Sequence, residues 1–130
     1  MFKNLLMSCL LGMIAIIIGA FGAHSLKDVL TSAQLLSLET AVRYQMYHVI
    51  VLLFVNTYDG FSSKQKNNIS YLFFAGILFF SGSIYAIQFT PVTAKSIWFV
   101  TPLGGLLLIL GWGGMLMVFL KKSSKKIIKK

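Results

Sequence analysis

The sequence predicts an all-α, polytopic membrane protein with four transmembrane helices and a short amphipathic helix between the first and second. Hydrophobic residues make up 57% of the 130 residues, and charged residues make up only 12%. The apolar residues form blocks too long for a soluble core, each near the ~20 residues that a helix needs to cross a bilayer. Four such helices leave no room for a soluble domain.

The apolar runs set the order of the helices. They are Leu5–Ala23, Ala41–Tyr58, Ile69–Phe89 and Ile97–Leu120. We therefore expect one four-helix transmembrane domain, residues 1–120, and a lysine-rich tail, residues 121–130. The predicted tail has no aromatic residue and no fold for reading bases, so we expect no nucleic-acid partner. Contact with anionic lipid suits it better.

The first run also resembles a secretory signal peptide. Lys3 supplies a basic start, and Ala20-Phe21-Gly22 resembles a cleavage site. We favour a retained helix, because Ala15, Gly19 and Ala23 recur every four positions. This spacing lets two helices approach closely inside a bilayer.

Basic residues predict the orientation. With four crossings both termini lie on one side, which then holds nine of the twelve Lys and Arg residues. The other side holds Lys27, Arg43 and Lys95. Because basic residues collect on the cytoplasmic side of membrane proteins, we expect both termini in the cytoplasm.

The connections are short. Residues 32–39 have apolar side chains at helical spacing, which predicts an amphipathic helix in the outer interface, capped by Thr31 or Ser32. Residues 59–68 should form a polar cytoplasmic turn, and residues 90–96 a short outer turn.

The fourth run contains a proline near its outer end. Pro102 cannot donate to the carbonyl of Trp98, which predicts a kink and a freed carbonyl beside Thr101. That carbonyl could line a ligand site, or Thr101 or water could satisfy it.

Polar side chains within the runs lie mostly in the outer halves, within roughly 12 Å of the outer interface. Such groups are costly in hydrocarbon and usually serve a ligand, a partner or a buried network. The inner halves are mostly apolar. The candidate ligand-binding residues are His24, Arg43, Tyr44, Gln45, Tyr47, His48, Ser81, Ser83, Tyr85 and Thr101.

The second run carries the densest part of this cluster. Glu39, Arg43 and Tyr47 are four residues apart on one helical stripe, and Tyr44 and His48 form a neighbouring stripe. Two interpretations are open. Either these side chains face a cavity, with Arg43 as an anchor for an anion, or Arg43 snorkels and the tyrosines form an interfacial belt.

The two histidines raise a haem or metal site as an alternative. No third ligand accompanies His24 and His48, and Cys9 is the only cysteine. Buried hydrogen-bonding histidines are the simpler interpretation, and we expect no metal and no cofactor.

Several segments resemble one family in order along residues 1–120. They are Gly19–His24, Glu39–His48, Phe80–Tyr85, Thr101–Gly105 and Gly111-Trp112. The chain is similar to the small bacterial membrane proteins of domain-of-unknown-function family number 423, which are related to a small mitochondrial transmembrane protein. The resemblance implies four helices in the bacterial cytoplasmic membrane and supplies no activity.

We expect a non-enzymatic protein that binds a lipid, a small amphiphile or a partner membrane protein through the outer cluster. No arrangement of nucleophile and base and no phosphate-binding loop indicates an enzyme. Membrane lipids are the expected partners, with other membrane proteins or self-association as further possibilities. The alternatives are an oligomeric transporter or channel component, and a haem- or quinone-linked redox protein.

Overall fold

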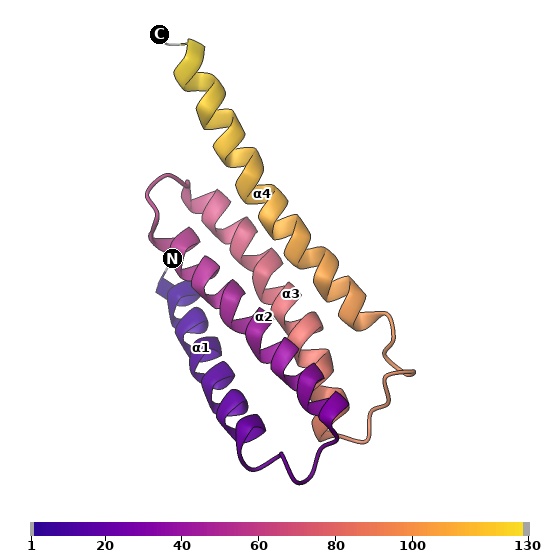
Figure 1. Cartoon of the computed structure of the whole chain (residues 1–130). Coiled ribbons are helices and arrows are strands. Elements are labelled where there is room, and N and C mark those ends of the chain that lie inside the picture. Colours follow the sequence, from indigo (N-terminus) through magenta and orange to yellow (C-terminus); the bar gives the residue numbers. More distant parts are fainter. Residues whose placement is uncertain (1, 129–130) are drawn as a thin grey trace.

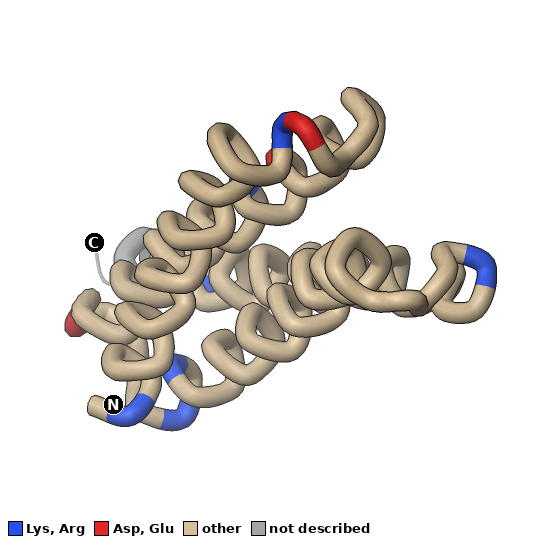
Figure 2. The backbone as a smooth tube through the Cα atoms, turned by 90° about the horizontal axis from the view of Figure 1, so that it is seen from below, with Lys and Arg blue, Asp and Glu red and all other residues tan. Residues whose placement is uncertain are grey.

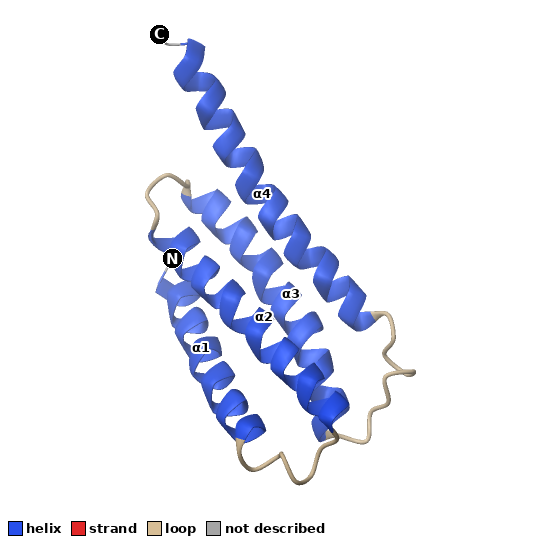
Figure 3. Ribbon diagram, in the orientation of Figure 1, coloured by secondary structure: helices blue, strands red, loops and turns tan. Residues whose placement is uncertain are grey.

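The fold is an open row of four antiparallel helices. The computed structural model describes the backbone of residues 2–128 and the side chains of residues 2–124. The helices are α1 (Phe2–Ala23), α2 (Ser32–Thr57), α3 (Ser63–Phe89) and α4 (Val100–Ile128). Each packs on the next in chain order, so that α1 and α4 occupy the edges of the row (Figures 1 and 3). The predicted all-α fold is confirmed.

The row has two distinct ends. The start of α1, the turn between α2 and α3 and the last turns of α4 lie at one end, here called the terminal end (Figure 1). The other two connections lie at the opposite end, here called the loop end. Charged residues concentrate at the helix ends and in the connections, and long stretches between them carry no charge (Figure 2).

Within residues 2–128, three helices are long and apolar enough to cross a membrane, namely α1, α3 and α4 as far as Ser124. The remaining helix, α2, has 26 residues and is more polar. Its polar side chains Gln45, His48 and Asn56 are buried. Because α2 lies between α1 and α3, the protein itself shields these groups from hydrocarbon.

Helices α2 and α3 begin six or more residues before their apolar runs, which start at Ala41 and Ile69. The expected amphipathic segment is helical, but it forms the first turns of α2 and is not a separate helix. Thr31 is its N-cap, in a capping box with Gln34. Ser62 and Gln65 form the same motif and start α3 at Ser63, so the second connection is shorter than the expected residues 59–68.

The predicted kink at Pro102 is wrong. Helix α4 begins at Val100, which places Pro102 in the first turn, where a backbone N–H needs no partner within the helix. The N–H of Leu103 then donates to the carbonyl of Phe99 at 3.1 Å. Helix α4 continues through the lysines to Ile128, and residues 129–130 of the predicted tail lie outside the described residues.

Small residues form the contact face of α1. They are Ser8, Gly12, Ala15, Gly19 and Gly22, at alternating spacings of four and three. A Cβ atom at Gly22 would lie 3.0 Å from the side chain of Leu38 on α2. The predicted close approach of α1 is thus present, although its stripe differs from the expected one, because Ala23 is exposed.

Candidate functional site

Gln45, midway along α2, makes hydrogen bonds to the helices on both sides. It is only 2% exposed. Its Nε2 donates to the backbone carbonyl of Leu11 on α1 at 2.7 Å, and its Oε1 accepts from the hydroxyl of Tyr85 on α3 at 3.0 Å. One amide therefore joins three helices.

The predicted serines also join helices. Ser81 is buried and donates to the carbonyl of Ala41 on α2 at 2.8 Å. Ser83 and Thr101 share a hydrogen bond of 2.6 Å between α3 and α4. These groups hold the row together where hydrocarbon offers no other partner.

His48 is buried with both ring nitrogens engaged. Nδ1 contacts the carbonyl of Tyr44 at 2.7 Å, and Nε2 accepts from the indole N–H of Trp112 on α4 at 3.3 Å. The His48 ring also packs on Phe73 of α3. His24 is exposed in the turn after α1. The described residues contain no group of three or more His, Cys, Asp and Glu that could hold a metal ion.

The other predicted site residues lie on the surface of the row. Tyr44 and Tyr47 are 42% and 55% exposed, and Tyr44 packs on Phe80 with ring centroids 4.9 Å apart. Arg43 and Glu39 form the expected ion pair, with Nη2 and Oε2 3.5 Å apart. Their side chains are 54% and 68% exposed, so the pair contributes only about 0–1 kcal/mol. Ligand contact by His24, Arg43 and the tyrosines stays a prediction.

A second polar network lies at the terminal end, which the sequence interpretation treated as apolar. Asn4 donates to Asn56 at 3.0 Å and to Asn67 at 3.1 Å. Asn56 in turn donates to Ser70 at 2.8 Å, and buried Lys66 donates to the Asn56 carbonyl at 3.1 Å. Polar groups therefore join α1, α2 and α3 both midway along the row, at Gln45, and at its terminal end. The sequence offered one signal for this network, because the side-chain amide of Asn56 lies inside an apolar run.

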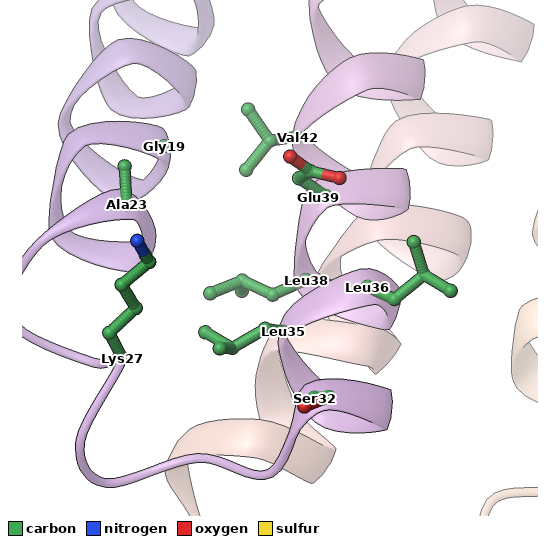
Figure 4. A pocket seen from close by; sticks show the side chains of 10 residues that line it. Gly19, Ala23, Lys27, Ser32, Leu35, Leu36, Leu38, Glu39 and Val42 are labelled. Atoms are coloured by element: carbon green, nitrogen blue, oxygen red, sulfur yellow. The ribbon is translucent and has the colours of Figure 1, made fainter.

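A pocket of about 430 Å³ opens between α1 and α2 at the loop end. The small residues Gly19 and Ala23 form its α1 wall, and Leu35, Leu38 and Val42 form its α2 wall (Figure 4). The space exists because the α1 residues that face α2 here are glycine and alanine, which leave room beside the larger side chains of α2. The pocket is therefore an apolar slot between two helices.

Charged groups border this slot. The side chain of Lys27 extends from the connection alongside Ala23, and Glu39 lies across from it on α2 (Figure 4). Ser32 lines the pocket in the first turn of α2. None of the ten predicted site residues lines this pocket, and Lys27 was not among them. A lone cation next to a small-residue stripe was the sequence signal for it.

These features define a small helical membrane protein with polar contacts between its helices. The chain belongs to the family described as "Protein of unknown function (DUF423)", whose model matches residues 18–105. A UPF0382 membrane protein of Staphylococcus aureus is 41% identical over 108 residues, which cover 83% of this chain and 87% of that protein. A UPF0382 membrane protein of Haemophilus influenzae is 36% identical over 114 residues, 85% of this chain and 87% of its own length. No solved structure matches significantly.

Proposed function

We propose that the protein is a non-catalytic membrane protein that binds a phospholipid, or a similar amphiphile with an anionic head group, between α1 and α2. The observation that carries this proposal is the pocket of about 430 Å³ with apolar walls and Lys27 at its rim. Ligand pockets in proteins span about 300–1,000 Å³ and combine apolar walls with a few polar groups. The site has this composition.

The charges favour an anion. Glu39 and Arg43 form an ion pair on α2. Glu39 also lines the pocket, but its carboxylate already has Arg43 as an exposed, weak partner, and Lys27 is the cation that faces the pocket. A lysine ammonium binds phosphate as a compact point charge. The apolar walls would hold the first part of an acyl chain below that phosphate.

The distribution of basic residues supports one orientation. Lys3, Lys64, Lys66, Lys121 and Lys122 belong to the terminal end, whereas Lys27 and Lys95 lie in the loop-end connections and Arg43 lies in the loop-end half of α2. We propose that the terminal end and both chain termini face the cytoplasm. The pocket then opens in the outer leaflet of the bacterial cytoplasmic membrane.

Two lysine substitutions, one at the pocket and one outside it, test the proposal. Native mass spectrometry of the protein titrated with phosphatidylglycerol measures the affinity. Lys27→Gln removes a charge-assisted contact of about 1.5–3 kcal/mol and should weaken binding about tenfold or more. Lys95→Gln removes an equivalent charge in the other loop-end connection and should leave the affinity unchanged.

Pocket volume is tested separately from charge. Ala23→Trp places a large ring in the pocket, whereas Ala20→Trp places the same ring on an exposed position of α1 outside it. Only Ala23→Trp should abolish binding. Equal loss in both tryptophan variants, or in both glutamine variants, would contradict the site.

A further inference from the structure

The pocket between α1 and α2 carries opposite charges on its two sides. Lys27 lines it from the connection after α1, and Glu39 lines it from α2 (Figure 4). Within residues 2–124, Glu39 forms its ion pair with Arg43 on its own helix and not with Lys27 across the pocket. A cation and a carboxylate can therefore both contact a ligand in the same pocket.

Arg43 satisfies Glu39 only in part. A single contact of 3.5 Å joins Nη2 of Arg43 to one carboxylate oxygen, Oε2. The two side chains are more than half exposed, and ion pairs of this kind are weak. Arg43 does not line the pocket. The second oxygen of Glu39, Oε1, can therefore accept a hydrogen bond from a ligand while Arg43 stays in place.

A phosphate in this pocket meets attraction from one side and repulsion from the other. Lys27 attracts it, whereas the carboxylate of Glu39 repels it. A positive group on the same ligand, placed next to Glu39, turns that repulsion into attraction. Charge complementarity of this kind contributes chiefly to specificity. Glu39 is thus positioned to discriminate between phospholipids that all present a phosphate to Lys27.

We propose that the pocket prefers a lipid head group that carries a primary ammonium beside its phosphate, as in phosphatidylethanolamine, and that Glu39 determines this preference. The inference rests on the proposed function, because it uses the same pocket and the same contact between phosphate and Lys27. Ethanolamine joins the two charged groups through a short linker, so the phosphate can face Lys27 while the ammonium faces Glu39. The ammonium only donates hydrogen bonds and the carboxylate only accepts them.

The experiment compares two lipids that differ beyond the phosphate. Native mass spectrometry measures the affinity of the protein for phosphatidylethanolamine and for phosphatidylglycerol with identical acyl chains. Both lipids contain the phosphodiester, but only the first has an ammonium group. We expect phosphatidylethanolamine to bind about two- to fivefold more tightly, the range for one exposed charge pair.

Variants connect this preference to Glu39. Glu39→Gln should remove or reverse the preference, because it deletes the carboxylate and frees Arg43 to attract phosphatidylglycerol. It should leave the protein folded, because the ion pair that it breaks is exposed. Lys27→Gln should weaken the binding of both lipids alike. Asp28→Asn is the matched control, because Asp28 is an exposed carboxylate next to Lys27 that does not line the pocket, and it should leave the preference unchanged.

Glycerophosphoethanolamine tests whether the ligand is a lipid, because it has the head group without the acyl chains. It should not displace phosphatidylethanolamine at equal concentration, since the apolar walls of the pocket, at Leu35, Leu38 and Val42, would then have nothing to bind. Displacement at equal concentration would overturn the assignment to a lipid.

Failure of this inference can be told apart from failure of the proposed function. Equal binding of the two lipids, or a preference that Glu39→Gln lowers no more than Asp28→Asn does, would overturn the role of Glu39 even if Ala23→Trp still abolishes the binding of both. If Ala23→Trp abolishes the binding of neither lipid, the pocket is not the site and both proposals are wrong.

Discussion

Trp112 on α4 donates its indole N–H to Nε2 of His48 on α2 at 3.3 Å, past the ring of Phe73 on the intervening helix α3. This hydrogen bond connects two helices that are not neighbours in the row. Because Nε2 accepts this hydrogen bond, the proton of the neutral ring lies on Nδ1, which contacts the carbonyl of Tyr44 on the same helix.

Trp112→Phe should therefore destabilise the protein by about 1 kcal/mol, the usual contribution of one neutral hydrogen bond. The free energy of unfolding in mixed micelles measures the effect. Trp98→Phe is the control, because Trp98 is 73% exposed and should show a change near zero. Equal losses in the two variants would show that the hydrogen bond contributes nothing.

Two glycines of α4 should differ in how they tolerate alanine. A Cβ atom at Gly104 would clash with the backbone nitrogen of Phe80 and approach the backbone carbon of Phe79 to 2.7 Å, whereas a Cβ at Gly113 meets nothing within 4 Å. Backbone atoms cannot move aside easily, so Gly104→Ala should cost about 1–3 kcal/mol of unfolding free energy. Gly113→Ala should cost nothing. A neutral Gly104→Ala would contradict the close packing of α3 on α4.

Asn56 carries the network at the terminal end. It is 1% exposed and bonds to Asn4 and Ser70. Asn56→Ala leaves buried Ser70 without its partner, although Asn4 keeps its bond to Asn67, and we expect a loss of about 1–3 kcal/mol in the free energy of unfolding. Asn68→Ala changes an exposed asparagine of α3 and should be neutral. If both variants unfold alike, the network is not stabilising.

The proposed orientation predicts which cysteines an impermeant maleimide can reach. The native Cys9 is exposed and is first replaced by serine. In whole cells, Ser96→Cys at the loop end should react, whereas Ser63→Cys at the terminal end should react only after permeabilisation. The reverse pattern would place the pocket in the inner leaflet.

Hydropathy predicted the existence of the helices well, because an apolar run must be helical in a bilayer. It placed their ends less well. Residues 32–39 were expected as a separate interfacial helix and residues 63–68 as part of a turn, yet the capping boxes at Thr31 and Ser62 make both segments the first turns of α2 and α3. The kink expected at Pro102 failed for the same reason. A proline kinks a helix only in its interior, and α4 begins at Val100, so Pro102 lies in the first turn.

The candidate site was harder to predict than the fold. One partner of Gln45, Tyr85, was among the predicted residues, but the other is the backbone carbonyl of Leu11, and a carbonyl carries no sequence signal. The partner of His48 is Trp112, and only the packing order of the helices brings the two together. The pocket forms because Gly19 and Ala23 of α1 have little or no side chain, and the sequence interpretation used these small residues only to predict close helix packing.

The most direct test of the proposed function is to map where the lipid binds. A photoactivatable phosphatidylglycerol, with the reactive group close to its head group, is crosslinked to the protein in nanodiscs, and the labelled peptides are identified by tandem mass spectrometry. The account predicts that labelling concentrates in residues 19–42 and falls when Ala23→Trp fills the pocket. Labelling spread evenly over the exposed faces of α1 and α4, and unchanged by Ala23→Trp, would contradict it.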